Sequence, residues 1–486
     1  MGKLRGFLEH DRREAPERDP RARTGDYREF VGTLSLTELR DQAGRCMECG
    51  VPFCHSGCPL GNLIPDWNDL VYRDRWHEAV EQLHRTNNFP EFTGRLCPAP
   101  CEAACVLEIN EGDAVSIKQV EVAIVNRAWE EGWVVPRPAR TRTGKSVAVI
   151  GSGPAGLACA QQLVRQGHAV TVFERDEAAG GLVRFGVPEF KIEKRLVERR
   201  VGQLVAEGVE FRLGIEVGAD VDPDELRAAH DALVIATGAR VPRDLSIPGR
   251  ELGGVHFAME YLYSRMRRDG AVSAAGKHAI VVGGGDTGAD CVGHAHREGA
   301  ASVTQIELLG EPPEKRRDDQ TPWPAWPMKL RTSYALKEGG ERSFAVSTTA
   351  LSGNGHVDRI HWQRNTGEPP FEPVAGTDET HPAELVLLAM GFVGPEQELL
   401  DRLSVERDAR SNVAAPAYTT SVEGVFAAGD ARRGQSLIVW AIAEGRRCAA
   451  AVDEWLAGPR VVEAQATTAA RATMRPRSSR EGAQHG

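Results

Sequence analysis

Two segments of the chain repeat the same order of hydrophobic and polar positions. In residues 146–176, a short β-branched run is followed by a glycine-rich turn, an apolar pattern with helical spacing and a second β-branched run. Residues 277–309 repeat this order. Buried strands that alternate with amphipathic helices are typical of parallel α/β sheets, and glycine after the first strand is typical of nucleotide-binding units. The pattern therefore predicts two such units in one chain.

The segments outside these units have different patterns. Residues 64–87 have helical spacing and lie within a cysteine-containing region, residues 33–132. We interpret the basic, proline-containing residues 134–145 as a linker. We expect the charged residues 1–26 to form an extended arm, and the tail from about Gly458, which lacks apolar periodicity, to be disordered.

Composition narrows the class of protein. The chain has 486 residues, of which 41% are hydrophobic, and its net charge is −10. The length predicts two or three globular domains, and the lack of a basic stripe argues against a nucleic-acid partner. No apolar run has the length of a membrane span, and the first residues lack the apolar core of a signal peptide. We therefore expect a cytoplasmic protein that does not associate with membranes.

The first glycine turn is a G-x-G-x-x-G motif formed by Gly151, Gly153 and Gly156. The first glycine permits a tight turn, the second lets a pyrophosphate approach the backbone, and the third lets helix and strand pack closely. The N-terminus of the following helix then offers N–H groups to the phosphates. Glu174 ends the next strand, where a carboxylate can accept hydrogen bonds from both ribose hydroxyls. Together these features predict a dinucleotide site.

Residues 425–447 assign this first site to a flavin. They resemble the closing motif of two-dinucleotide flavoprotein reductases, in which the acid at Asp430 bonds the ribityl chain and a helix N-terminus faces the N1/O2 edge of the flavin. The dipole of that helix would stabilise negative charge on the reduced flavin. Residues 233–240 and 387–396 match the crossover strands of the same architecture. The candidate FAD-binding residues are Gly151, Gly153, Pro154, Ala155, Gly156, Glu174, Gly181, Leu182, Gly238, Gly429, Asp430, Gln435, Ser436 and Leu437.

The second glycine turn, formed by Gly283, Gly285 and Gly288, predicts an exchanging nicotinamide coenzyme. Hydride passes between stacked nicotinamide and flavin rings without a protein acid or base, so no catalytic side chain is predicted. Glu307 could bond the 2′-hydroxyl of NADH. The basic run at residues 315–317 is either a solvated charge run or a clamp for the 2′-phosphate of NADPH, which we favour. The candidate NADPH-binding residues are Gly283, Gly285, Asp286, Thr287, Gly288, Lys315, Arg316, Arg317 and Gly391.

Seven of the ten cysteines lie between Cys46 and Cys105. The spacing over residues 46–59, C-x2-C-x4-C-x3-C-P, is close to a bacterial ferredoxin run. Disulfides fit poorly with an odd count in an unexported chain, and zinc would require tidy pairs, so iron–sulfur clusters fit best. Seven thiolates cannot fill two four-ligand clusters, so either three are spare or a non-cysteine group completes the second cluster. The other three cysteines, which we interpret as buried and inert, are Cys159, Cys291 and Cys448.

Longer motifs connect the chain to a known family. Residues 6–30, 46–72, 95–121, 180–194 and 427–446 resemble the small (β) subunit of NADPH-dependent glutamate synthase. This family shares its N-terminal region with dihydropyrimidine dehydrogenase. The resemblance implies an α/β fold with two Rossmann-like dinucleotide-binding domains, for FAD and NADPH, preceded by a helical iron–sulfur domain.

The resemblance also implies an activity. Such a protein takes a hydride from NADPH onto FAD and passes electrons through two [4Fe–4S] clusters. The acceptor is a large subunit that carries FMN and makes glutamate from glutamine and 2-oxoglutarate. The chain has no N-terminal cysteine nucleophile and no FMN-binding barrel, so we expect that it does not make glutamate alone. We expect the iron–sulfur domain to bind the large subunit, with the N-terminal arm ordering on contact.

The resemblance divides the cysteines into two ligand sets. The first cluster would be held by Cys46, Cys49, Cys54 and Cys105. The second would be held by Cys58, Cys97, Cys101 and Glu121, where the dehydrogenase has glutamine in place of the glutamate. Glutamate keeps an oxygen donor but adds negative charge, which should lower the potential of that cluster. Alternatively, Glu121 is an ordinary exposed helix acid.

Two other functions would account for the same glycine turns and cysteine motifs. One is a stand-alone NAD(P)H:ferredoxin-type reductase with a different acceptor, and the other is a non-enzymatic iron–sulfur scaffold, which two intact glycine turns disfavour. The expected domains are an arm and iron–sulfur domain (1–140), a first FAD-binding part (141–250), a NAD(P)H-binding domain (251–395), a second FAD-binding part (396–460) and a disordered tail (461–486).

Overall fold

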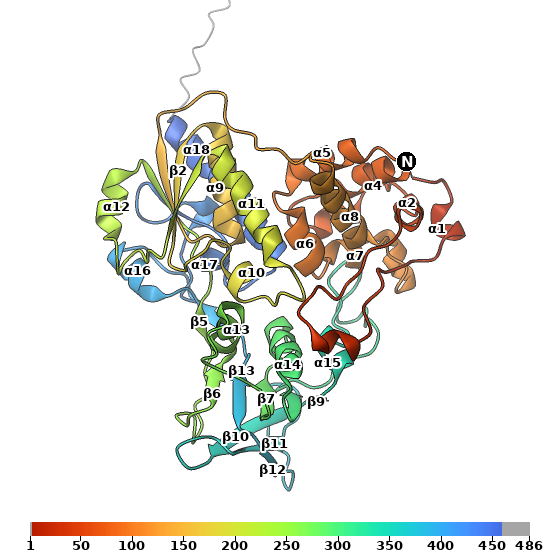
Figure 1. Ribbon diagram of the computed structural model, residues 1–486, viewed down its shortest axis with the longest axis vertical. Helices are drawn as coiled ribbons and strands as arrows, with labels where there is room; N and C mark the ends of the chain where they lie inside the picture. Colours follow the sequence, from red (N-terminus) through yellow and green to blue (C-terminus); the bar gives the residue numbers. More distant parts are fainter. Residues whose placement is uncertain (1, 459–486) are drawn as a thin grey trace, which may run out of the picture.

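The computed structural model describes residues 2–458, in which a helical domain lies beside two α/β domains (Figure 1). This confirms the predicted α/β architecture with a preceding helical domain. The segment 461–486, expected to be disordered, lies outside the described residues. The expected domain boundaries stay predictions. No helix within residues 2–458 has both the length and the apolar character needed to cross a membrane.

The cysteine-containing region folds into helices around a core that includes the fully buried Trp67. The helical pattern at residues 64–87 forms two helices, because the chain turns at Arg73–Arg75, where Asp74 has a positive φ. The helices of this domain and of the arm are α1 (Gly6–Glu9), η1 (Ala22–Gly25), α2 (Leu36–Gly44), α3 (Phe53–Gly57), α4 (Ile64–Tyr72), α5 (Trp76–Thr86), α6 (Pro90–Leu96), α7 (Pro100–Ala103), η2 (Val106–Asn110) and α8 (Ile117–Glu130).

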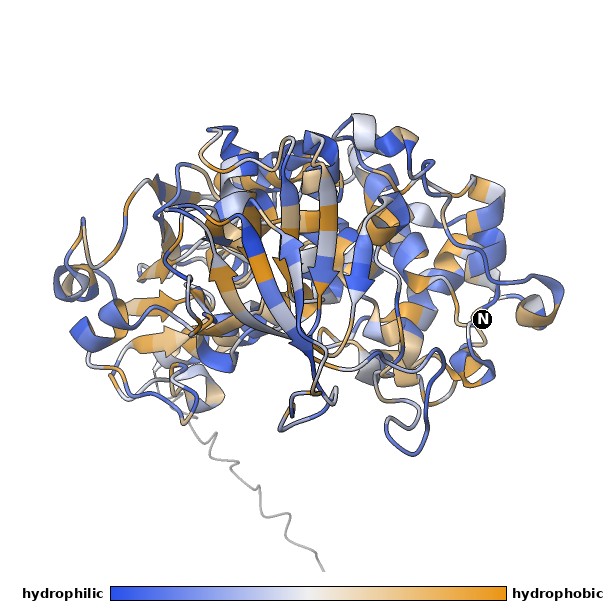
Figure 2. Ribbon diagram, turned by 90° about the horizontal axis from the view of Figure 1, so that it is seen from below, coloured by the Kyte–Doolittle hydropathy of each residue, from blue (hydrophilic) through white to orange (hydrophobic). Residues whose placement is uncertain are grey.

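Five parallel strands form the first sheet, in the order β15-β4-β1-β2-β3. The central strands β1 and β4 consist almost wholly of buried residues, as a parallel sheet covered on both faces requires, whereas the edge strand β3 is partly exposed. Figure 2 shows both hydrophobic and hydrophilic positions along the strands. Strand β15 comes from the C-terminal part of the chain, so this domain is built from two segments. Its elements are β1 (Ser146–Ile150), α9 (Pro154–Gln166), β2 (Ala169–Glu174), α10 (Leu182–Phe185), α11 (Lys194–Glu207), β3 (Val209–Leu213), α12 (Pro223–Ala229), β4 (Ala232–Ile235), α16 (Gln397–Arg402), η3 (Pro416–Tyr418), β15 (Val425–Ala427), α17 (Asp430–Arg433) and α18 (Ile438–Ala457).

The second sheet is also parallel, in the order β6-β13-β7-β8-β9. A three-stranded antiparallel sheet, β10-β11-β12, extends this domain. The short strands β5 (Val241–Pro242) and β14 (Phe392–Gly394) pair where the chain passes between the two α/β domains. The remaining elements are β6 (Val255–Phe257), α13 (Ala258–Arg267), β7 (His278–Val282), α14 (Asp286–Glu298), β8 (Ser302–Ile306), α15 (Tyr334–Glu338), β9 (Glu341–Ser343), β10 (Val346–Ser352), β11 (Arg359–Arg364), β12 (Glu379–Pro382) and β13 (Leu385–Leu388).

The N-terminal arm is not free, contrary to the expectation that it orders only on a partner. It runs beside α14 and α15 of the second α/β domain (Figure 1). The fully buried Arg23 donates from Nε to Glu338 Oε1 at 2.6 Å and from Nη2 to the Tyr334 carbonyl at 2.7 Å. The Phe30 ring stacks on Tyr334 with centroids 4.9 Å apart. The arm therefore joins the helical domain to the second α/β domain within one chain.

Candidate functional site

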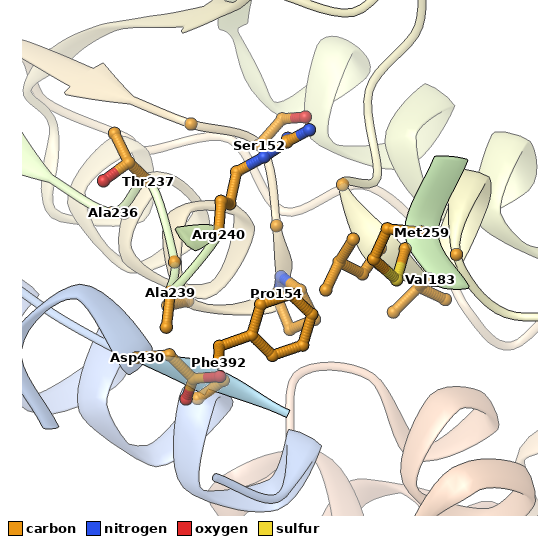
Figure 3. A pocket seen from close by; sticks show the side chains of 18 of the residues that line it. Ser152, Pro154, Val183, Ala236, Thr237, Ala239, Arg240, Met259, Phe392 and Asp430 are labelled. Atoms are coloured by element: carbon orange, nitrogen blue, oxygen red, sulfur yellow. The ribbon is translucent and has the colours of Figure 1, made fainter. Parts of the chain in front are cut away.

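A cavity of about 660 Å³ lies between the domains, with walls from both glycine turns and from the helical domain. Figure 3 shows Ser152, Pro154 and Asp430 among its lining residues. The predicted FAD-binding residues that line it are Gly151, Gly153, Pro154, Ala155, Glu174, Gly181, Leu182, Gly238, Asp430, Ser436 and Leu437. Asp286 and Thr287 of the second glycine turn line the same cavity. One hollow thus collects residues predicted for two dinucleotides.

The first glycine turn has the shape of a phosphate cradle. Gly151 has a φ of +102°, and a Cβ there would lie 2.5 Å from the Ala236 carbonyl oxygen. A Cβ on Gly156 would lie 2.0 Å from the Gly151 oxygen, which explains the close packing of α9 on β1. A Cβ on Gly153 would meet nothing within 4 Å, so this glycine faces open space at the start of α9. The turn leaves the helix N-terminus accessible to a pyrophosphate.

Glu174 lies at the end of β2 and holds the glycine turn in place. Its Oε2 accepts hydrogen bonds from the Ser152 amide at 2.9 Å and the Ser152 hydroxyl at 2.5 Å. Its Oε1 accepts from the Asp176 amide at 2.9 Å. A carboxylate oxygen has more than one acceptor site, so Glu174 retains capacity for ribose hydroxyls.

Asp430 begins α17 and lines the same cavity. Burial raises the pKa of this carboxyl to about 6, and the Ser436 hydroxyl donates to its Oδ1 at 2.6 Å. Leu437 is the N-cap of α18, whose first turn lines the cavity. A partly buried acid beside a helix N-terminus fits the polar chain and the electron-accepting edge of a flavin.

Three of the predicted FAD-binding residues do not line the cavity: Gly156, Gly429 and Gln435. Gly156 serves the packing of α9, and a Cβ on Gly429 would lie 2.6 Å from Ala155 Cβ. The Gln435 Oε1 accepts a hydrogen bond from the Phe392 amide at 2.9 Å. A Cβ on Gly391 would lie 2.8 Å from the Gln435 amide. Gln435 and Gly391 thus meet at the crossover between the two α/β domains.

Lys191, a partly buried lysine in the cavity wall, is not among the residues predicted from the sequence. Lys191 Nζ donates to Asp290 Oδ1 of α14 at 2.9 Å, and the Tyr334 hydroxyl donates to the same oxygen at 2.8 Å. Burial raises the pKa of Asp290, and the ammonium of Lys191 opposes that rise. Lys191 lies within the predicted flavin segment 180–194, but only the fold brings it to an acid of the second glycine unit.

The second glycine turn repeats the geometry of the first. Gly283 has a φ of +121°, and a Cβ there would lie 2.3 Å from the Ala389 oxygen. A Cβ on Gly288 would lie 2.3 Å from the Gly283 oxygen, whereas Gly285 faces open space at the start of α14. Glu307, which follows β8, lies over Gly284 and is paired with Arg342.

The predicted basic run makes its contacts elsewhere. Lys315 Nζ lies 4.0 Å from the Glu111 carboxylate of the helical domain. The Arg316 amide donates to Glu111 at 3.2 Å, and its guanidinium donates to carbonyls of its own loop. Arg317 pairs with Asp319 at 3.0 Å. The loop that carries them docks on the helical domain, where Trp323 Nε1 donates to the Cys105 carbonyl at 3.1 Å.

The first predicted ligand set surrounds one small cavity, which is lined by Cys46, Cys49, Cys54 and Cys105. Burial, together with the nearby thiols of Cys105 and Cys49, raises the pKa of the Cys46 thiol to about 12. Cys46 is buried, whereas Cys49, Cys54 and Cys105 are partly exposed. The fold thus gathers four thiols that lie as far apart in the sequence as Cys46 and Cys105.

The second predicted set lies deeper in the helical domain. Cys58, Cys97 and Cys101 are buried, and burial raises the pKa of all three thiols, with each of them also affected by the charge of Glu121. Glu121 is 6% exposed, so it is not the exposed helix acid considered as an alternative. Its Oε1 accepts hydrogen bonds from Asn87 Nδ2 at 2.8 Å and Thr93 Oγ1 at 2.7 Å.

These donors fit iron–sulfur chemistry. Thiolates are the usual ligands of such clusters, and an oxygen donor oriented by two hydrogen bonds is a suitable outer partner or ligand. Among residues 2–458, no three His, Cys, Asp or Glu side chains are arranged to hold a single metal ion. The assignment of individual residues to FAD, NADPH and clusters stays a prediction.

Comparison with known families divides the chain in the same way. Residues 23–133 match the family described as dihydropyrimidine dehydrogenase domain II, 4Fe-4S cluster. Residues 145–322 match the family described as pyridine nucleotide-disulphide oxidoreductase. A solved structure of FprA from Mycobacterium tuberculosis has a TM-score of 0.52 and 18% identity, and the match covers 64% of this chain and 84% of that one. This last likeness shows the fold alone.

Curated relatives match nearly the whole chain. The glutamate synthase [NADPH] small chain of Mycobacterium tuberculosis is 55% identical over 469 residues, which cover 93% of this chain and 96% of the relative. The protein of the same name from Bacillus subtilis is 46% identical, and the match covers 95% of this chain and 100% of that protein. Glutamate synthase [NADH] of Schizosaccharomyces pombe is 49% identical over 93% of this chain, which matches 23% of that larger protein. The chain therefore belongs to the family of glutamate synthase small chains.

Proposed function

We propose that this chain oxidises NADPH through FAD and passes the electrons through two [4Fe–4S] clusters to a large glutamate synthase subunit. That subunit carries FMN and makes glutamate from glutamine and 2-oxoglutarate. Membership of the family of small chains supports this function. A cavity that joins both glycine turns to the cysteine-containing domain supports it independently.

The first glycine turn would hold FAD. The open face of Gly153 and the start of α9 suit the pyrophosphate, and Glu174 suits a ribose. Asp430 suits the ribityl chain, and the N-terminus of α18 would stabilise negative charge at the flavin edge. Bound FAD supplies the chemistry that accepts two electrons as a hydride and releases them singly.

The second glycine turn would hold NADPH. Asp286 and Thr287, at the start of α14, face the same cavity as the flavin residues. A dinucleotide bound at this turn would direct its nicotinamide into the cavity that the flavin residues line, where hydride transfer needs the two rings to meet. The protein residues orient the two rings and exclude water, and none of them has to donate or accept a proton.

The proposed direction of electron flow rests on the position of Cys97 next to the flavin cavity. Leu96 and Pro98, its two neighbours in the chain, line the flavin cavity, so the second cysteine set adjoins that cavity. The first set includes Cys49 and Cys54, which are partly exposed. Electrons would therefore leave the flavin through the second set and exit through the first, towards a partner that docks on the helical domain.

Anaerobic reduction tests this function. NADPH added to purified protein is expected to bleach the flavin absorbance and then the broader iron–sulfur absorbance. Artificial dyes added afterwards should accept these electrons. A chain that binds FAD and iron but is not reduced by either nicotinamide coenzyme would contradict the proposal. Reduction of the flavin by NADPH with no change in the iron–sulfur absorbance would contradict the proposed route from FAD to the clusters.

A further inference from the structure

We propose that Arg342 binds the 2′-phosphate of the coenzyme and thereby sets a preference for NADPH over NADH. The inference rests on the proposed function, because it assumes that the second glycine turn takes a nicotinamide dinucleotide. Membership of the family does not decide the preference. The relatives include proteins named for NADPH, at 55% identity, and for NADH, at 49% identity.

Glu307 marks the place of the adenosine ribose. In a βαβ dinucleotide site the residue that ends the second strand lies beside this ribose, where an acid bonds the 2′-hydroxyl and a nearby arginine accommodates a 2′-phosphate. Glu307 directly follows β8, the second strand of the unit. A Cβ on Gly284, in the glycine turn, would lie 1.8 Å from Glu307 Cδ. The carboxylate thus rests directly on the turn, where the ribose would bind.

Arg342 reaches the same place from the neighbouring strand. It lies on β9, which pairs in parallel with β8 so that Arg342 is opposite Gln305. Its guanidinium forms a close ion pair with Glu307 Oε1 through both Nε and Nη2. Its Nη1 donates to the Arg331 carbonyl at 3.2 Å, and the group lies 4.5 Å from the centre of the Phe344 ring. The side chain is only 15% exposed, so it is already ordered towards Glu307.

Glu307 and Arg342 can accommodate either NADPH or NADH, but only NADPH requires their ion pair to open. The planar guanidinium suits bidentate binding of a phosphate, so a 2′-phosphate would take over the donors that now serve Glu307. With NADH, the 2′-hydroxyl would donate to Glu307 and the ion pair would stay intact. Without Arg342, the Glu307 carboxylate would face the phosphate with no compensating charge. Arg342 is therefore a specificity-determining residue, and Glu307 opposes it.

The basic run at residues 315–317 is the competing candidate. Its side chains already contact Glu111, Asp319 and carbonyls of their own loop. None of these contacts involves the second glycine turn or Glu307. The two candidates can be compared directly by mutation.

Binding of nucleotide fragments to the cofactor-loaded chain tests the proposal. We expect wild-type protein to bind 2′,5′-ADP more tightly than 5′-AMP by calorimetry. Arg342→Ala should weaken 2′,5′-ADP binding about tenfold or more, because the charge-assisted bonds to the 2′-phosphate are lost and Glu307 then faces that phosphate without a compensating charge. Binding of 5′-AMP, which has no 2′-phosphate, should change much less. Arg342→Lys should restore part of the affinity. Arg359→Ala, which removes an exposed charge from the same domain, is the control.

The same variants separate the possible failures. Unchanged 2′,5′-ADP affinity in Arg342→Ala, together with a loss in the Lys315, Arg316 and Arg317 triple alanine variant, would overturn the proposal in favour of the basic run. Equal wild-type affinity for 2′,5′-ADP and 5′-AMP would also overturn the proposal, and a subunit that uses NADH would then be the better explanation. A chain that binds neither fragment nor NADH would instead contradict the proposed function. Retained 5′-AMP binding shows that Arg342→Ala is folded.

Discussion

Arg23 of the N-terminal arm and Glu338 of α15 form a fully buried ion pair, with Nε and Oε1 2.6 Å apart and no exposure of either side chain. Arg297 of α14 binds the same carboxylate at 2.6 Å, so one acid holds two arginines. Burial of charge is costly unless each group is paired and hydrogen-bonded, and here the arm supplies half of the compensation. The arm is therefore part of the folded chain and not a free segment that waits for a partner.

Arg23→Ala is expected to lower the free energy of unfolding by about 2–3 kcal/mol, since charged hydrogen bonds are lost from a buried site while Arg297 still neutralises Glu338. Chemical denaturation of the purified chain measures this change. Arg21→Ala, two residues away and exposed, is the matched control and should have little effect. Equal stability of the two variants would show that the arm does not dock as described. For the same reason, deletion of residues 1–26 is expected to destabilise the chain itself.

Two [4Fe–4S] clusters should give about eight iron atoms and eight sulfides per chain when the protein is prepared without oxygen. Glu121→Ala should lose up to half of the iron, because the second set would keep only three thiolates. Glu121→Gln, which keeps an oxygen donor, should retain more iron than Glu121→Ala. Glu130→Ala, an exposed acid on the same helix, is the control. A wild-type content near four iron atoms, or full iron in Glu121→Ala, would contradict this ligand set.

Lys191 and Asp290 are expected to shift the flavin potential in opposite directions. Lys191→Met removes a positive charge from the cavity wall and should lower the two-electron midpoint potential of FAD, because negative charge on the reduced flavin loses a partner. Asp290→Asn leaves that ammonium uncompensated and should raise the potential. A change of about 1.4 kcal/mol corresponds to about 30 mV. Redox titration of the bound flavin measures both, and shifts of the same sign would rule out the electrostatic explanation.

His294 of α14 should make stability depend on pH. Its ring is fully buried among Tyr27, Phe190 and Tyr261, and neither ring nitrogen has a hydrogen-bond partner. Burial holds its pKa well below the ordinary value, and the positive charges of Arg297, Arg265 and Lys194 lower it further. The unfolded chain therefore binds the proton more readily, so this contribution to stability is present above about pH 6.5 and is lost as the pH falls below that value.

His294→Phe is expected to reduce the loss of stability between pH 7.5 and pH 5.5 by about 1 kcal/mol. The aromatic surroundings accept a phenylalanine ring, and no hydrogen bond is lost. Denaturant titrations at the two pH values measure the difference. His84, whose pKa burial also lowers, leaves a residual slope in the variant. A variant with the full wild-type slope would show that His294 is not the group responsible.

The strongest sequence signals were local, and these were the parts that could be predicted. Glycines that require a positive φ, such as Gly151 and Gly283, sit between a β-branched strand and a helix, so both nucleotide units were found from the chain alone. The spacing of the cysteines indicated clusters. Their division into two sets came from a family resemblance, because cysteines as far apart as Cys46 and Cys105 meet only in the folded domain.

What the sequence could not show were contacts between distant elements. Arg342 reaches Glu307 because β9 happens to pair with β8, whereas the basic run at residues 315–317 is nearer in sequence but belongs to a loop that docks on another domain. The charged residues 1–26 were expected to form an extended arm that orders on contact with a partner. Arg23 is instead buried against residues more than 300 positions away, which no local pattern reports.

Reconstitution with the large subunit tests the central claim most directly. The chain alone is expected to reduce dyes with NADPH but to form no glutamate from glutamine and 2-oxoglutarate. Addition of a glutamate synthase large subunit should produce NADPH-dependent glutamate in proportion to the complex formed. Iron-depleted chain, which keeps its FAD, should oxidise NADPH but fail to support the synthesis. If the large subunit gains no nicotinamide-dependent activity from the intact chain, the account is contradicted and a stand-alone reductase with another acceptor is the better explanation.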